Sequence, residues 1–299
     1  MKLDYQAGFM AARLICLTLF TILSIIGGTC PLVAQPLVRR VVVVSIDGAR
    51  PDGLLQAKTP TITRLWKRGA YSFRAQTIFP STTLPSHTSM LTGLTPDRHG
   101  MWKNSWEPGQ PTVAVETVFS LAASHGLKTA MVVAKGKLAF LTRPGSPHLV
   151  KVISAPAPKV AAWAARYLAS EQPELLFVHF ADADWTGHRH GWMTPAYLEA
   201  LELADQGVEI LLRALEQTGL VHETLFILTA DHGGHGRIHG TARPEDMTIP
   251  WIAFGPGARE GYEIQEAIVT TDTAATILDA LNLPIPEGWD GRPLRSIFR

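Results

Sequence analysis

Cysteine is nearly absent from this sequence, which has only two in 299 residues. Both of them, Cys16 and Cys30, lie close to the N-terminus. The rest of the chain can therefore form no disulfide within itself, and its fold must depend on a packed core and on any metal that it binds. Exported bacterial proteins without disulfides are common, so the count decides little about the compartment.

Neither charge is in surplus, and long basic runs are absent. The 27 lysine and arginine residues balance 26 acidic residues, which gives a formal net charge of +1, and no Lys/Arg run exceeds two residues. Nucleic-acid-binding surfaces usually carry a basic stripe, so we expect no stable nucleic-acid partner, although a nucleotide could still be a substrate. Hydrophobic residues make up 46% of the chain, which indicates a globular protein with a large core.

The sequence has no hydrophobic run of clear membrane-spanning length. Its N-terminal apolar run, residues 14–28, follows Lys2 and Arg13 and falls short of the roughly 20 residues that a spanning helix needs. This pattern is typical of a signal peptide, and we expect residues 1–35 to be a leader with a cleavage site after Ala34. A retained membrane anchor is the alternative. Either interpretation places residues 36–299 in the periplasm or outside the cell.

Strand-length apolar runs alternate with helical patterns along the rest of the chain. Residues 41–44 are four consecutive valines, as expected for a strand that is buried on both faces. Further strands are expected at 128–134, 175–180, 225–229 and 249–254, and helices at 117–125, 158–170, 196–218 and 273–281. This alternation predicts an α/β fold, in which a mostly parallel sheet is covered by helices on both faces of a single domain.

Acidic residues follow three of the predicted strands. Asp47 comes after the valine strand, Asp184 after the strand at 175–180, and Asp231-His232 after the strand at 225–229. Sites in parallel sheets form at the carboxyl ends of the strands. We therefore expect these side chains to meet there, whereas residues kept only for solubility would lie on helix surfaces.

Histidines accompany these carboxylates at spacings that suit a metal site. His188 follows Asp184 by four residues, which is one helical turn or a tight loop, and His232 is followed by two glycines that allow a sharp turn. Each motif on its own is more often a turn or a surface pair. The occurrence of all three motifs after buried strands is hard to explain by chance. Mixed oxygen and nitrogen ligands favour zinc, manganese or iron over calcium or magnesium.

A hydroxyl-rich segment, residues 79–93, leads into an apolar helical stretch. A hydroxyl at a helix N-terminus is often only a cap. The same position also favours an anion, and a hydroxyl bound to a metal there can ionise near neutral pH. The segment is therefore compatible with both a capping and a nucleophilic role.

Taken together, residues 40–299 resemble the alkaline phosphatase superfamily, and most closely its type I phosphodiesterase and nucleotide pyrophosphatase branch. Several separated motifs carry the resemblance: Ser45-Ile46-Asp47-Gly48, Thr83-Leu84-Pro85-Ser86-His87, His99-Gly100, Asp184 with Gly187-His188, Asp231-His232-Gly233, and Ile249-Pro250 with Gly255-Pro256-Gly257.

The resemblance implies two divalent metal ions. It assigns Asp47, Asp231 and His232 to one ion, and Asp184 and His188 to the other together with a later histidine. The sequence has no histidine after His239. His239 is therefore the expected third imidazole, and His235 is the alternative.

The resemblance also implies covalent chemistry. Thr83 matches the nucleophile, which is also a metal ligand, and would form a phospho-threonine intermediate that water hydrolyses. Asn104 matches the amide that donates a hydrogen bond to a phosphoryl oxygen. We therefore expect a metal-dependent hydrolase of small phosphate esters. An inactive binding module of the same fold is the non-enzyme alternative, which the presence of nucleophile and ligands together disfavours.

Two lysines, Lys135 and Lys137, bear on the class of substrate. They are either solvated loop residues or cations that bind an extra substrate charge. We expect a phosphodiester or pyrophosphate as the substrate. Because the two lysines could bind an additional negative charge, a phosphomonoester or a phosphonate such as phosphonoacetate is the alternative. A sulfatase is disfavoured because the sequence lacks the Cys-x-Pro-x-Arg pattern of that branch.

Overall fold

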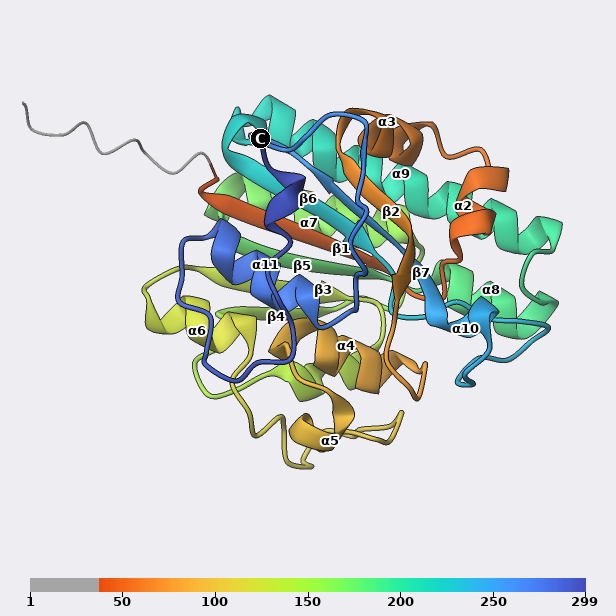
Figure 1. The fold of residues 1–299 in the computed structure, drawn as a ribbon, viewed down its shortest axis with the longest axis horizontal. Coiled ribbons are helices and arrows are strands. Elements are labelled where there is room, and N and C mark those ends of the chain that lie inside the picture. The colour runs from red at the N-terminus through yellow and green to blue at the C-terminus, as the bar shows by residue number, and fades with distance from the viewer. Residues whose placement is uncertain (1–37) are drawn as a thin grey trace, which may run out of the picture. The chain divides into compact units, whose positions relative to one another are not determined.

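The structure, a computed structural model, describes residues 38–299 of the chain (Figure 1). The expected leader, residues 1–35, lies outside the described residues. Among the helices that are described, none is both long enough and apolar enough to cross a bilayer.

An eight-stranded sheet runs through the centre of the domain. Across the sheet the order is β4 (Leu149–Val152), β3 (Thr129–Val133), β5 (Leu175–Phe180), β1 (Arg40–Ile46), β6 (Thr224–Thr229), β7 (Thr248–Phe254), β2 (Ala70–Gln76) and β8 (Tyr262–Glu263). Of these strands, β7 alone runs antiparallel to its neighbours. The valine strand β1 pairs with β5 on one side and β6 on the other and is buried throughout, which explains its unbroken apolar run.

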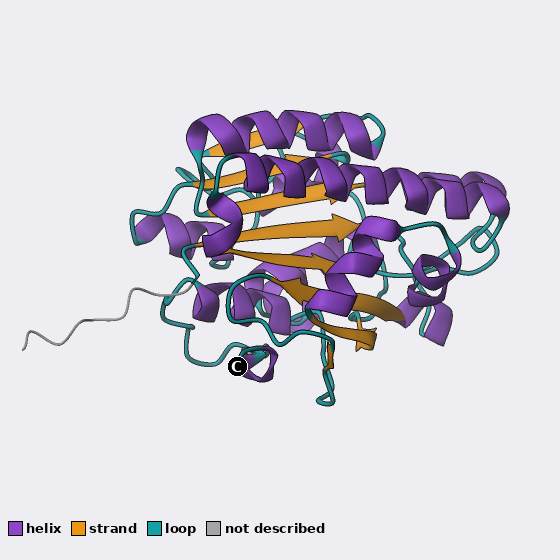
Figure 2. Ribbon diagram, turned by 90° about the horizontal axis from the view of Figure 1, so that it is seen from above, coloured by secondary structure: helices purple, strands orange, loops and turns teal. Residues whose placement is uncertain are grey.

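Helices cover both faces of the sheet, as Figure 2 shows. One layer contains α2 (Pro51–Gln56), α3 (Pro60–Arg68), α7 (Ala157–Glu171), α8 (Asp182–His190) and α9 (Pro195–Gln217). The other contains α4 (Thr83–Thr92), α6 (Val118–Ser124) and α11 (Asp272–Ala280). The short helices are α5 (Pro96–His99), α10 (Pro244–Met247), and the 3-10 turns η1 (Gly136–Leu141), η2 (Leu220–Glu223) and η3 (Arg295–Ile297).

The predicted fold class is confirmed, and the predicted strands and helices all form with small differences at their ends. The short edge strands β4 and β8 and the longer strand β2, which pairs with β7, were not predicted. The reason is clearest for β2. Its buried and exposed residues are mixed, and its pairing with β7 shifts register between Ser72 and Ala75, so no continuous apolar run marks it. The carboxyl end of β2 leads to the hydroxyl-rich segment at the start of α4.

A buried carboxylate fixes α3 to the long helix α9. Asp205 of α9 accepts hydrogen bonds from the backbone N–H groups of Thr61 (3.3 Å) and Ile62 (2.7 Å) in the first turn of α3. The first N–H groups of a helix have no partner within the helix, and Asp205 satisfies two of them across the interface. Thr59 provides no side-chain cap for α3, so the Asp205 carboxylate acts as the cap of this helix.

We expect Asp205→Ala to lower the free energy of unfolding by about 2 kcal/mol, because it leaves two buried donors without a partner. Asp205→Asn, which keeps one acceptor oxygen, should lose less. Urea unfolding followed by circular dichroism measures both, and a stability equal to wild type for Asp205→Ala would show that the contact does not contribute.

Candidate metal centre and active site

The carboxyl ends of β1 and β6 bring two carboxylates and an imidazole together. Asp47, Asp231 and His232 are fully buried, and the His232 Nε2 atom lies 3.3 Å from both Asp47 Oδ1 and Asp231 Oδ2. The ligand atoms of these three residues all lie within 4.8 Å of one another. We call Asp47, Asp231 and His232 the first ligand group.

A second group lies beside it. Asp184 and His188 are one turn apart on α8, with His188 Nε2 at 3.3 Å from Asp184 Oδ1. His239 Nε2 lies 3.4 Å from the same oxygen and 3.1 Å from His188 Nε2. We call Asp184, His188 and His239 the second ligand group. The alternative histidine, His235, instead contacts Asp246 Oδ1 at 2.7 Å through its Nδ1 atom.

Backbone carbonyls fix the tautomers of the three imidazoles. In each case Nδ1 lies 2.8–3.0 Å from a carbonyl oxygen: Arg237 for His188, Gly233 for His232, and Ser81 for His239. A carbonyl only accepts hydrogen bonds, so each Nδ1 must donate. In a neutral ring, each Nε2 then carries a lone pair that points into the site, which is the arrangement usual for a metal-ligating histidine.

Carboxylate oxygens without donors face these lone pairs. Asp47 Oδ1, Asp184 Oδ1 and Asp231 Oδ2 are buried and make no hydrogen bond within the described residues. Buried acceptors almost always have a partner, and acceptors that face one another at 3.1–3.4 Å need a proton or a metal cation between them. The mixed oxygen and nitrogen donors therefore fit a divalent metal such as zinc.

The protonation equilibria also show a site that attracts positive charge. Burial and the adjacent charge of Asp47 raise the pKa of Asp231 to about 7. Burial opposes a charge on His232, but the carboxylates of Asp231 and Asp47 raise its pKa to about 9. For His239, burial and the neighbouring His232 lower the pKa to about 4, so this ring stays neutral.

Lys135, just after β3, lies between the two ligand groups. Its ammonium nitrogen is 2.7 Å from Asp47 Oδ2 and 2.5 Å from Asp184 Oδ2, and it donates a 3.3 Å hydrogen bond to Thr83 Oγ1. Burial alone would lower the pKa of Lys135, but the carboxylates of Asp47 and Asp184 raise it, so the side chain stays charged. Lys135 is thus a fixed cation of the site and not a solvated loop residue.

Thr83, the first residue of α4, is buried beside the ligand groups, with its Oγ1 atom 3.5 Å from His232 Nε2. Asn104 lies next to this helix end. Its Oδ1 atom accepts hydrogen bonds from the Leu84 backbone N–H (3.0 Å) and from the Lys137 ammonium (2.8 Å). Both contacts use the amide oxygen of Asn104, so its NH₂ group can donate a hydrogen bond to another acceptor.

The structure adds two histidines that the sequence did not assign to the site. Ala134 N–H donates to His179 Nδ1, so His179 Nε2 carries the hydrogen and donates to Asp47 Oδ2 at 2.9 Å. His87 donates through Nδ1 to the Thr83 carbonyl at 2.7 Å and lies 3.4 Å from Asp231 Oδ2. The only signal for His179 was a single histidine within the apolar strand β5, which is not enough to identify a partner.

Gly48 lets the chain turn between the ligand groups. It has φ +74°, and a Cβ atom there would lie 3.1 Å from the Asp184 Cα atom. Its N–H donates to Asp231 Oδ1, and its carbonyl accepts hydrogen bonds from the Trp192 indole and the Tyr197 hydroxyl. A side chain at this position would push apart the turn that carries Asp47 and the helix that carries Asp184.

Solved structures of related proteins share this fold. The murine ectonucleotide pyrophosphatase/phosphodiesterase 5, solved in an inactive form with AMP, matches 87% of this chain and all of that chain, with a TM-score of 0.75 and 17% identity. A phosphonate monoester hydrolase from Silicibacter pomeroyi matches 87% of this chain and 76% of that one, with a TM-score of 0.66 and 17% identity.

Sequence comparisons identify the family. Ectonucleotide pyrophosphatase/phosphodiesterase family member 3 of Bos taurus is 26% identical over 226 residues, which are 64% of this chain and 24% of that protein. Member 1 of Mus musculus is 27% identical over 256 residues, 72% of this chain and 27% of that protein. The chain thus spans about a quarter of the length of these relatives. A family model described as type I phosphodiesterase/nucleotide pyrophosphatase matches residues 41–238. Because this match covers more than half of the chain, the chain belongs to the type I phosphodiesterase/nucleotide pyrophosphatase family of the alkaline phosphatase superfamily.

Proposed function

We propose that this protein hydrolyses phosphate esters, with phosphodiesters or nucleotide pyrophosphates as its first substrate class and Thr83 as its nucleophile. The observation that carries the proposal is the position of Thr83 Oγ1, which lies at the start of α4 within 3.5 Å of His232 Nε2 and 3.3 Å of the Lys135 ammonium. Membership of the family and the phosphodiesterase names of the relatives support the substrate class.

Two divalent metal ions fit the facing donors, and we propose zinc, with manganese or iron as alternatives. The first ligand group and Thr83 would hold one ion, and the second ligand group would hold the other. Bound there, the ions would lower the pKa of the Thr83 hydroxyl and stabilise negative charge on the attacking and leaving oxygens.

The chain's own residues then account for two displacement steps. Thr83 loses its hydroxyl proton to solvent, and its oxygen attacks the phosphorus while the bond from phosphorus to the leaving oxygen breaks. The leaving oxygen takes a proton from water, and the phosphoryl group stays on Thr83. Water then attacks this phospho-threonine, which releases the phosphate product and restores the hydroxyl.

Binding groups for the phosphoryl oxygens surround Thr83. The N-terminus of α4, a helix of ten residues, favours an anion at this place. The Asn104 amide is free to donate because its oxygen is held by Leu84 and Lys137. Lys135 adds a charge beside Thr83. Together these groups would orient the phosphoryl group for attack.

A phosphomonoester is the second candidate substrate, and the two lysines favour it. Two divalent ions with Lys135 and Lys137 carry six positive charges, and three aspartates with an ionised Thr83 carry four negative charges. The surplus of two matches a monoester, which carries roughly two negative charges near neutral pH, whereas a diester carries one. A phosphonate that also carries a carboxylate would balance the same two surplus positive charges.

Export is proposed for the whole chain. The apolar run at residues 14–28 is typical of a signal peptide, and the relatives are named as ectoenzymes or venom enzymes. Cleavage or retention of residues 1–35 as an anchor stays a prediction from the sequence.

We expect the zinc- or manganese-loaded protein to hydrolyse bis-p-nitrophenyl phosphate. Thr83→Ala should lower kcat by at least about a thousandfold, because the covalent route is lost, while Thr83→Ser should keep measurable activity. In parallel, p-nitrophenyl phosphate and phosphonoacetate test whether the protein prefers a monoester or a phosphonate. The substrate with the highest kcat/KM identifies the preferred substrate class. Absence of turnover with all three would contradict the proposed function, and full activity of Thr83→Ala would contradict the nucleophile.

We expect His239→Ala to lose about half of the bound zinc, because the second ligand group loses one of its three ligands. His235→Ala is the matched control and should keep its zinc, since His235 contacts Asp246. Elemental analysis of both dialysed proteins measures the difference. Loss of zinc from His235→Ala alone would assign the third imidazole to His235 instead.

A further inference from the structure

Several large apolar side chains that are close in sequence to candidate site residues are exposed. Of the eight that are exposed in the part of the chain that the structure describes, four lie within four residues of a candidate site residue: Phe79, Trp102, Trp185 and Ile238. Exposed apolar surface that borders a polar site often marks the place where part of a ligand binds. These exposed side chains are therefore suited to contact an apolar part of the substrate.

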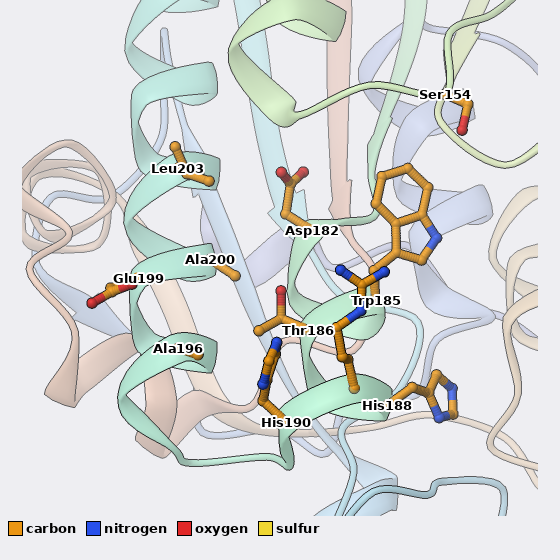
Figure 3. Close-up of a pocket in the computed structure, with 11 residues that line it drawn as sticks. Ser154, Asp182, Trp185, Thr186, His188, His190, Ala196, Glu199, Ala200 and Leu203 are labelled. Atoms are coloured by element: carbon orange, nitrogen blue, oxygen red, sulfur yellow. The ribbon is translucent and has the colours of Figure 1, made fainter.

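Trp185 lies on α8, the helix that carries Asp184 and His188 of the second ligand group. It follows Asp184 directly and stands three residues before His188 on α8, so both side chains share one face of the helix. Figure 3 shows Trp185 and His188 projecting from the same side of α8. The Trp185 side chain is 36% exposed, so its indole can take a ligand against it.

Trp185 and His188 line one pocket, with a volume of about 870 Å³ (Figure 3). Its size lies within the range of sites for small ligands. The lining also includes Ser154 and the apolar side chains of Ala200 and Leu203 on α9. His188 belongs both to this pocket and to the second ligand group, so the pocket borders that group.

The charges of the pocket disfavour an anionic occupant. Its lining carries two carboxylates, Asp182 and Glu199, and one guanidinium, Arg189, together with the imidazoles of His188 and His190. The carboxylates outnumber the guanidinium, so the lining has no surplus of positive charge for a polyanion such as pyrophosphate. An exposed indole, in contrast, binds flat apolar groups by stacking and by burial of their surface.

In-line displacement by Thr83 would direct the leaving group toward this pocket. The attacking and leaving oxygens lie roughly in line on opposite sides of the phosphorus. Thr83 is placed beside His232 of the first ligand group, so the leaving oxygen would lie toward the second ligand group. The substituent on that oxygen would then extend past His188 toward Trp185.

We propose that the pocket between α8 and α9 binds the leaving group of the ester, that this group is planar and apolar, and that Trp185 stacks on it and determines specificity. The inference rests on the proposed function, because it needs hydrolysis at Thr83. It narrows the substrate class to esters of aromatic or similarly flat alcohols and away from nucleotide pyrophosphates.

The test compares two leaving groups in wild type and variants of the zinc-loaded protein. The substrates are methyl p-nitrophenyl phosphate and methyl trichloroethyl phosphate, or the corresponding monoesters where these are hydrolysed faster. We expect Trp185→Ser to lower kcat/KM about tenfold for the aryl ester and less than about twofold for the alkyl ester. Trp185→Phe should keep most of the aryl activity, because an aromatic ring remains.

Leu55→Ser is the control, since Leu55 is another exposed apolar residue, 58% exposed on α2. It should leave the ratio of the two kcat/KM values unchanged. Equal losses for both esters in Trp185→Ser, or no loss for either, would overturn the leaving-group inference while the wild-type hydrolysis still supports the proposed function. Absence of turnover by wild type with every ester would instead contradict the proposed function itself.

Discussion

The site depends on imidazole nitrogens and carboxylate oxygens that face one another at close range and need positive charge between them. Three imidazole nitrogens, each committed to this orientation by a carbonyl on the far side of its ring, point at buried carboxylate oxygens that have no donor. Such an arrangement is repulsive in the absence of positive charge. It becomes stable when cations occupy the space between the donors, and Lys135 already contributes one fixed charge there.

The fold supplies this arrangement from segments far apart in the chain. Parallel strands β1, β5 and β6 end at one edge of the sheet, and each delivers one aspartate within a few residues of its end. The loops that follow β2 and β6 supply the carbonyls that orient His239 and His232. The same edge receives Thr83 at the start of α4 and Lys135 after β3, so the nucleophile and the charges around it are placed by the sheet as a whole.

The fold, and the meeting of most candidate site residues at one edge of the sheet, could be predicted because buried parallel strands are continuous apolar runs and their ends are where sites form. The valine strand with Asp47 and the strand before Asp231 are examples. The choice between His235 and His239 stayed open because both lie in a glycine-rich loop, and only the fold shows His235 on Asp246. The contact of His179 with Asp47 joins neighbouring strands distant in sequence, and β2 lacks a continuous apolar run. A single histidine in an apolar strand does not identify its partner, and a strand without an apolar run is not recognised from its sequence.

The most direct test of the account is diffraction from crystals of the zinc-loaded protein at the zinc absorption edge. We expect two anomalous peaks, one at the first ligand group and one at the second, at about 2.0–2.2 Å from their nitrogen and oxygen atoms. Zinc absent from either ligand group, or bound to His235 in place of His239, would contradict it.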